Sequence, residues 1–144
     1  MNKTELFRMS NAFSAETVIY GYTFGSGEKA AAIIGSMRGN EYQQLYICSR
    51  LSKRLSELEE SGNIVNGKKI LLIPTLNHAA HNINHKHWPA DDSDINRQFP
   101  GNPKGTATSR IAYQIQKILS GYSYAVQFPS FYKDVECIPH VSNL

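Results

Sequence analysis

The sequence predicts an α/β fold with a mixed, mostly parallel sheet, and three neighbouring segments carry that prediction. Residues 30–35 and 68–74 are short, continuous apolar runs, which is typical of strands buried on both faces. Between them, residues 41–60 place apolar side chains at helical spacing, namely Leu45, Cys48, Leu51, Leu55 and Leu58. A strand, a helix and a second strand in this order predict a parallel βαβ unit.

The remaining elements lie on either side of this unit. Residues 17–24 are rich in β-branched and aromatic side chains and predict a strand that could pair with 30–35 as a hairpin. Residues 106–119 predict a second helix, with Thr106 or Thr108 as its N-cap. Its apolar face consists of Ala107, Ile111, Ile115 and Ile118. Residues 124–128 predict a last strand.

Composition narrows the class of protein. The 144 residues are 41% hydrophobic and 19% charged, which fits one globular domain over 1–144. The net charge of +3 comes without a lysine/arginine block, so we expect no nucleic-acid binding. No segment has the length and apolarity of a membrane span or a signal peptide. Cys48 and Cys137 form neither a disulfide framework nor a CxxC site, and we expect a reduced, cytoplasmic protein.

Two loops are the candidate functional site. The turn at 35–41 and the long polar stretch at 77–105 each follow a strand, and the two strands should be parallel neighbours. In open α/β sheets, ligands bind outside the carboxyl ends of such strands. A polar stretch as long as 77–105 is itself typical of a functional or disordered loop.

In the turn, Arg38 and Glu41 allow two interpretations. A glutamate at a helix start is favoured by the helix dipole, and Arg38 could simply pair with it. Alternatively, an ionisable residue, a glycine and a glutamate at the end of a strand suit a ligand or a metal ion. Spacing alone favours the ion pair.

In the loop, the segment DINRQFPG at 94–101 presents Asn96 and Arg97. The planar guanidinium of arginine can bind a carboxylate with two hydrogen bonds, and asparagine can donate beside it. Asp94 could orient Arg97. The alternative is a salt bridge that only fixes the loop, and the residues do not decide between the two.

The same loop contains four of the five histidines, His78, His81, His85 and His87. Such a cluster can bind zinc or nickel. Without a cysteine pair or an HExxH motif the signal is weak, and solvated loop histidines are the simpler interpretation.

Taken together and in order, these motifs resemble the succinylglutamate desuccinylase/aspartoacylase family of zinc carboxypeptidase-like hydrolases. GSMRGNE is similar to the family's glycine–x–histidine–glycine–(aspartate or asparagine)–glutamate segment, and LLIPTLN to its next strand. DINRQFPG is similar to its aspartate–leucine–asparagine–arginine–x–phenylalanine–proline–glycine segment, and YAVQFPSF to its aspartate–leucine–histidine strand. The resemblance implies a three-layer α/β/α domain that is truncated here, with this chain matching an N-terminal half.

The resemblance also implies roles for individual residues. In the family, zinc is held by a histidine, a glutamate and a later histidine; here Arg38, Glu41 and Pro129 hold those places. Gln127 stands for the family's aspartate. Guanidinium offers no lone pair to a metal, and one carboxylate does not hold zinc, which takes about four ligands. We therefore expect Glu41 to be a surviving ligand position with zinc absent from the standard site.

The family's substrate-carboxylate residues match Asn96 and Arg97, so the implied ligand is a small carboxylate such as an N-acyl amino acid. Three alternatives follow. The chain could be a deacylase-like hydrolase of an amide bond, with Arg38 and Glu41 as candidate catalytic residues or with a new metal site of Glu41, His85 and His87. Because two of the implied zinc ligands and the family's general-base glutamate are missing from this sequence, we expect hydrolysis by the family's route to fail in this chain alone. It could be a binder that uses the charge of Arg38 in place of the metal. It could also be part of an assembly, as a homo-oligomer or with a partner chain over an exposed sheet edge.

Overall fold

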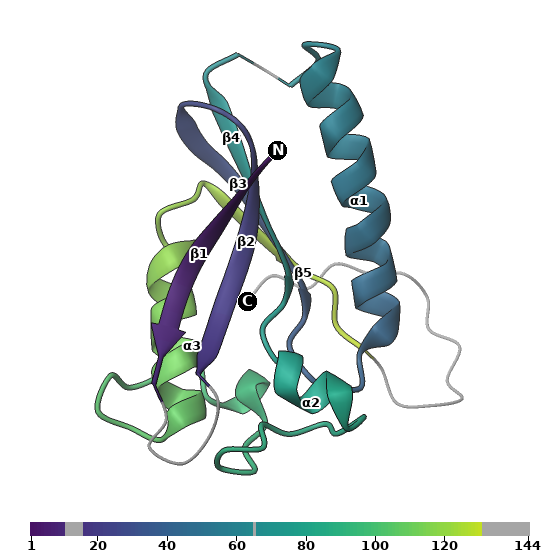
Figure 1. Ribbon diagram of the computed structural model, residues 1–144. Coiled ribbons are helices and arrows are strands. Elements are labelled where there is room, and N and C mark those ends of the chain that lie inside the picture. Colours follow the sequence, from purple (N-terminus) through teal and green to yellow (C-terminus); the bar gives the residue numbers. More distant parts are fainter. Residues whose placement is uncertain (11–15, 65, 131–144) are drawn as a thin grey trace.

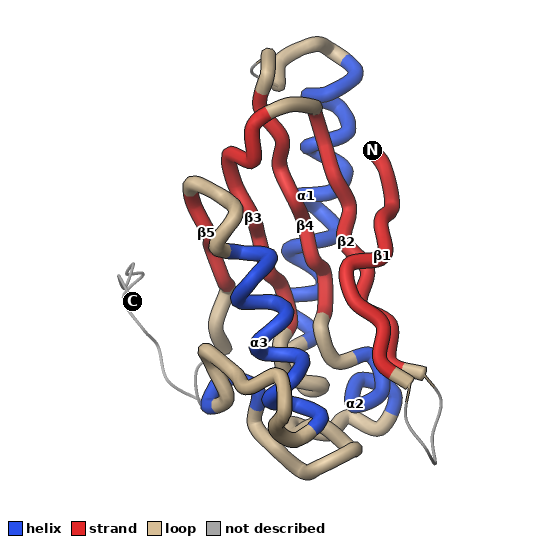
Figure 2. Tube along the Cα trace, turned by 90° about the vertical axis from the view of Figure 1, so that its left-hand side faces the viewer, coloured by secondary structure: helices blue, strands red, loops and turns tan. Residues whose placement is uncertain are grey.

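The computed structural model describes residues 1–10, 16–64 and 66–130. It contains one mixed sheet of five strands in the order β1-β2-β4-β3-β5 (Figure 2). The strands are β1 (Asn2–Met9), β2 (Thr17–Gly25), β3 (Glu28–Ser36), β4 (Lys68–Thr75) and β5 (Tyr124–Gln127). β3 pairs in parallel with both β4 and β5, whereas β2 pairs antiparallel with β1 and β4. The predicted α/β class and the parallel βαβ unit are confirmed.

Two long helices cover opposite faces of the sheet, which makes three layers (Figure 1). On one side, α1 (Tyr42–Glu60) packs Cys48 and Leu55 against Phe24 and Leu72. On the other, α3 (Ala107–Leu119) buries Ile111, Ala112 and Ile115 in the larger core cluster. Thr106 is the N-cap of α3, and its hydroxyl accepts from the Ser109 amide at 3.4 Å.

The predicted hairpin between the first two apolar strands is wrong, because β4 lies between β2 and β3. Leu71, Leu72 and Ile73 of β4 are all buried. Consecutive buried residues point to both faces of the sheet, as is typical of a central strand that is covered on both faces and paired along both edges. The β2–β3 turn spans the start of β4, where the Glu28 amide donates to the Gly67 carbonyl at 2.8 Å. Gly27 has a φ of 108° there, and a Cβ would lie 2.4 Å from that carbonyl oxygen.

The strand β1 was not predicted. Its sequence, NKTELFRM, is mostly polar, and the register against β2 shifts between Glu5 and Phe7, which disturbs the alternation that would have identified it. Met9 at its end is buried in the larger core cluster.

The long polar segment folds over the carboxyl ends of β3 and β4. It contains α2 (His78–Asn82) and the short 3-10 helix η1 (Ile95–Arg97), and it buries Trp88. Asp91 fixes it to the start of α3, because its carboxylate accepts from the Thr108 amide at 2.8 Å and from the Thr108 hydroxyl. These loops therefore have defined positions above the sheet. No helix in the described part of the chain is both long and apolar enough to cross a membrane.

Candidate functional site

The two predicted loops meet at one edge of the sheet. Ser36 and Thr75 are register partners at the ends of the parallel strands β3 and β4, so the chain leaves both strands at the same level. The turn then passes close to the polar loop at Gly39, where a Cβ would lie 2.3 Å from the His85 carbonyl oxygen. Only glycine fits this approach, which brings the turn at 37–41 into contact with the segment that follows β4.

Arg38 forms an ion pair with Asp94, across 56 positions of sequence. Arg38 Nε donates to Asp94 Oδ1 at 3.0 Å, and Nη2 donates to Oδ2 at 2.8 Å. The two side chains are 19% and 6% exposed, respectively. This is the two-pronged guanidinium–carboxylate geometry that fixes both partners. The expected contact between Asp94 and Arg97 is present but long: Arg97 Nε lies 3.9 Å from Asp94 Oδ2, and the Arg97 side chain is 80% exposed, so Asp94 makes its closer pair with Arg38.

Glu41 is the most enclosed charged side chain of the site. It precedes α1 as the N-cap but does not cap the helix; its Oε2 instead accepts from the amides of Met37 at 2.8 Å and Arg38 at 3.0 Å. The Ser130 hydroxyl donates to Oε1 at 2.7 Å. The predicted pairing with Arg38 is present, with Nη1 3.7 Å from Oε1.

The charges of this cluster balance. Asp94 and Glu41 supply two negative charges, while Arg38 and Lys86, whose Nζ is 3.5 Å from Asp94 Oδ2, supply two positive ones. Burial alone would raise the pKa of Asp94. The hydrogen bonds and charge of Arg38, the Asn96 amide and the charge of Lys86 outweigh burial and hold that pKa below its usual value. Asp94 is consequently a carboxylate at neutral pH.

Asn96 and Arg97 lie together on η1, beside this cluster. The side chain of Asp94 caps η1 by accepting from the Asn96 amide at 3.2 Å, which holds Asn96 and Arg97 beside the ion pair. Asn96 Oδ1 and Gln127 Nε2 are buried and have no hydrogen-bond partner among the described residues. A buried polar atom without a partner costs about 1–3 kcal/mol, so a ligand or water that satisfied it would bind favourably.

The residues at the places where the resemblance implies zinc ligands, apart from Glu41, have no side-chain donor for a zinc ion. Arg38, at the place where the resemblance puts a histidine, carries a permanent positive charge and no lone pair. Pro129 has no donor side chain, and the oxygens of Glu41 already accept hydrogen bonds. Within residues 1–10, 16–64 and 66–130, no three His, Cys, Asp or Glu side chains are arranged as metal ligands, so the trio of Glu41, His85 and His87 is not brought together.

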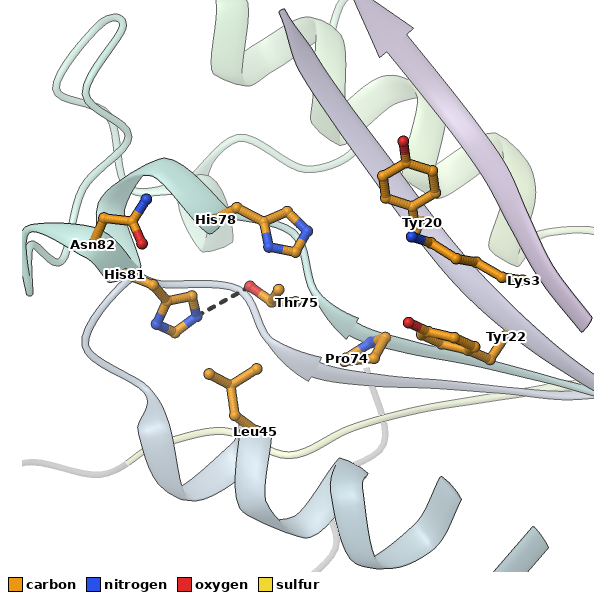
Figure 3. Close-up of a pocket in the computed structure, with 9 residues that line it drawn as sticks. All are labelled: Lys3, Tyr20, Tyr22, Leu45, Pro74, Thr75, His78, His81 and Asn82. Atoms are coloured by element: carbon orange, nitrogen blue, oxygen red, sulfur yellow. Dashed lines mark hydrogen bonds between the residues drawn. The ribbon is translucent and has the colours of Figure 1, made fainter. Parts of the chain in front are cut away.

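The histidines divide into two pairs. His78 and His81 share one face of α2 and point into the same pocket (Figure 3). His81 Nε2 lies 2.8 Å from Ser36 Oγ and 3.0 Å from Thr75 Oγ1, so it connects the ends of β3 and β4. His85 and His87 stack edge to face with ring centroids 5.7 Å apart, and His87 Nδ1 is 3.1 Å from Asp92.

Sequence reasoning missed two residues of this site. Lys86 stands between two histidines and belongs to no motif, although its ammonium contacts the buried Asp94. Ser130 follows β5 without any motif of its own, although its hydroxyl binds Glu41 across 89 positions. No motif or spacing in the sequence indicates either contact, because each depends on the tertiary structure.

Comparison with known proteins identifies relatives over most of the chain. The profile of the succinylglutamate desuccinylase/aspartoacylase catalytic domain matches residues 27–127. The N-alpha-acetyl-L-2,4-diaminobutyric acid deacetylase of Halomonas elongata is 30% identical over 94 residues, which are 65% of this chain and 26% of that protein.

Solved structures agree with this match. An aspartoacylase family protein from Mesorhizobium loti superposes with a TM-score of 0.73 at 25% identity, over 90% of this chain and 40% of that one. The product-bound ectoine utilization protein EutE (DoeB) from Ruegeria pomeroyi gives 0.69 at 25% identity, over 89% and 40%. This chain thus spans about two fifths of these solved relatives and about a quarter of the deacetylase.

Proposed function

The chain belongs to the succinylglutamate desuccinylase/aspartoacylase family, and we propose that it binds the carboxylate of an N-acyl amino acid or small dicarboxylate without zinc-dependent hydrolysis. The family as a whole is a zinc-dependent deacylase family. One observation supports the proposal: the guanidinium of Arg38 pairs with both Asp94 and Glu41, so a fixed positive charge already lies between two carboxylates of the candidate site.

The contact of Asp94 supports this substitution. Histidines that bind a metal ordinarily donate their other ring nitrogen to a carboxylate, which orients the ring. Asp94 contacts the side chain that stands at the family's histidine position, as such an orienting carboxylate would. Arginine at this position satisfies Asp94 directly and needs no metal to hold the carboxylates together.

Ligand binding is assigned to η1. Arg97 extends into solvent while its backbone is fixed by the Asp94 cap, so its guanidinium is accessible to a ligand carboxylate. Arg38 and Lys86 already balance Asp94 and Glu41, so the charge of Arg97 is the excess that an anionic ligand would neutralise. The buried Asn96 Oδ1 beside it could accept from an amide N–H of the same ligand.

The test is calorimetric titration of the protein with N-acetyl amino acids, N-succinyl amino acids and succinate. We expect Arg97→Ala to weaken binding at least tenfold, because a two-pronged arginine–carboxylate contact is lost. Arg50→Ala, which removes an exposed arginine from α1, is the matched control and should leave binding unchanged. Equal affinity of both variants for every ligand would contradict the proposed clamp.

Hydrolysis is the second function to test, because the relatives include a deacetylase. In the same samples, with zinc added, we expect no release of acyl groups. Turnover that requires zinc and disappears in Glu41→Gln would replace the binding proposal with a deacylase.

An assembly role is favoured by β5. This strand lies at one edge of the described sheet, and Tyr124 and Val126 are 73% and 47% exposed. We propose that a second copy or a partner chain covers this edge, and a strictly monomeric particle in light scattering would contradict it. A cytoplasmic location also remains our proposal, and the free, buried thiol of Cys48 is consistent with it.

A further inference from the structure

A polar pocket lies on the α1 side of the sheet, and Arg97 is not among the residues that line it. Its volume is about 460 Å³, within the usual range of small-molecule sites. Figure 3 shows its two walls: Lys3, Tyr20 and Tyr22 from the β1–β2 pair, and His78, His81 and Asn82 from α2. Leu45 of α1 and the β4 residues Pro74 and Thr75 complete it. None of these residues is Arg38, Glu41, Asn96 or Arg97.

The pocket has positive charge without a compensating carboxylate. Among the described residues that line it, one is a lysine, Lys3, two are histidines and none is acidic. The ammonium of Lys3 lies 3.9 Å from the centre of the Tyr20 ring, which positions it at the pocket wall. In the described chain, no ion-pair partner of Lys3 and no hydrogen bond from the Tyr20 or Tyr22 hydroxyl is found.

The pKa values of the two histidines reflect burial and the positive charges around them. The pKa of His78 is lowered mainly by desolvation and, to a smaller extent, by the charge of Lys3. The pKa of His81 is lowered mainly by desolvation and next by the charge of His78. A hydrogen bond with the Gly39 backbone and the charge of Glu41 raise it by smaller amounts. Further positive charge is thus unfavourable here unless an anion accompanies it.

We propose that this pocket binds a small organic anion, a carboxylate or a phosphate ester attached to a planar or aliphatic group. Lys3 and His78 hold the anionic oxygens, and Asn82 and the tyrosine hydroxyls can donate beside them. Leu45, Pro74 and the faces of the tyrosine rings contact the apolar part of the ligand. His81 is held by Ser36 and Thr75 and forms a fixed part of the floor.

The experiment uses the intact chain and follows the ring protons of His78 by NMR during titration with benzoate, phenyl phosphate and uncharged benzyl alcohol. We expect saturable shifts with one or both anions and none with the alcohol. The anion that binds with the higher affinity shows whether the pocket prefers a carboxylate or a phosphate group. Lys3→Gln should weaken anion binding about fivefold or more, because one ion pair is lost. Lys29→Gln is the matched control, since Lys29 also lies over a tyrosine ring, that of Tyr122, but outside the pocket.

Three results would overturn the proposal: no saturable shift with either anion, equal binding of the alcohol, or equal weakening in Lys3→Gln and Lys29→Gln. Arg97→Ala separates this site from the carboxylate clamp on η1. We expect it to leave the His78 titration unchanged, and loss of the shift in Arg97→Ala alone would assign the anion to the clamp.

Discussion

Arg38 and Arg97 belong to the same small site, yet the structure uses their charges in different ways. Arg38 is mostly buried, binds Asp94 through two hydrogen bonds and lies beside Glu41. Arg97 is on the same loop as Asp94, but 80% of its side chain is exposed. One charge is therefore paired within the protein and the other is accessible to solvent. We expect that removing the partner of Arg38 lowers stability, whereas removing Arg97 weakens the proposed ligand binding.

The largest expected effect follows from removing the partner of Arg38. Asp94→Ala leaves a mostly buried guanidinium without its main counter-charge, and we expect a loss of about 3 kcal/mol in the free energy of unfolding. Urea denaturation measures it. Asp92→Asn removes the charge of an exposed aspartate in the same loop, at a φ of 49° that asparagine also adopts, and should change stability by less than about 0.5 kcal/mol. Equal losses in the two variants would show that the Arg38–Asp94 pair contributes no more to the free energy of unfolding than an exposed aspartate does.

Glu41→Gln tests the other carboxylate beside Arg38. The glutamine keeps the shape but offers one acceptor oxygen to the Met37 and Arg38 amides and the Ser130 hydroxyl, which now use both oxygens. We expect a loss of about 1–2 kcal/mol, smaller than for Asp94→Ala, in the same denaturation assay. A gain in stability would mean that Glu41 is strained in its present role, as a residue kept for function would be.

The pH dependence of stability separates the two arginines further. The folded-state pKa of Asp94 is lowered from 3.8, so its contribution to stability is fully present above that value and is lost as the pH falls through the lower folded-state pKa. We expect the stability difference between the wild type and Asp94→Asn to be constant from pH 5 to 7. It should shrink only below about pH 3.8. A difference that already disappears near pH 5 would contradict the ion pair.

The smallest effect on stability is expected for Arg97→Ala. Its guanidinium makes only a long contact with Asp94 and remains in solvent, so the free energy of unfolding should change by less than about 0.5 kcal/mol. The same variant should lose carboxylate binding. A large destabilisation would show that Arg97 fixes the loop, which is the alternative that the sequence left open.

The sequence predicted the parts of this molecule whose signals are local. The continuous apolar run of β4 and the helical spacing of Cys48 and Leu55 identified the βαβ unit, because burial on both faces and on one helix face imposes those patterns. No local pattern determines the order of strands in the sheet. The strand β4 lies between the two strands that were expected to form a hairpin.

The site follows the same rule. Strand ends and family motifs singled out Arg38, Glu41, Asn96 and Arg97 as candidates, but sequence proximity indicated only the longer of the two contacts of Asp94, the one with Arg97. The closer partner, Arg38, is 56 positions away and is brought there by the parallel pairing of β3 with β4. The contacts of Lys86 and Ser130 likewise depend on the tertiary structure.

Zinc binding tests the central claim most directly, since that claim is that the guanidinium of Arg38 takes the place of a metal ion. Equilibrium dialysis of the purified chain against zinc, followed by elemental analysis, compares the wild type with Glu41→Gln. We expect no stoichiometric zinc that depends on Glu41. One zinc ion per chain in the wild type, lost in Glu41→Gln, would contradict the claim and restore a metal-dependent deacylase.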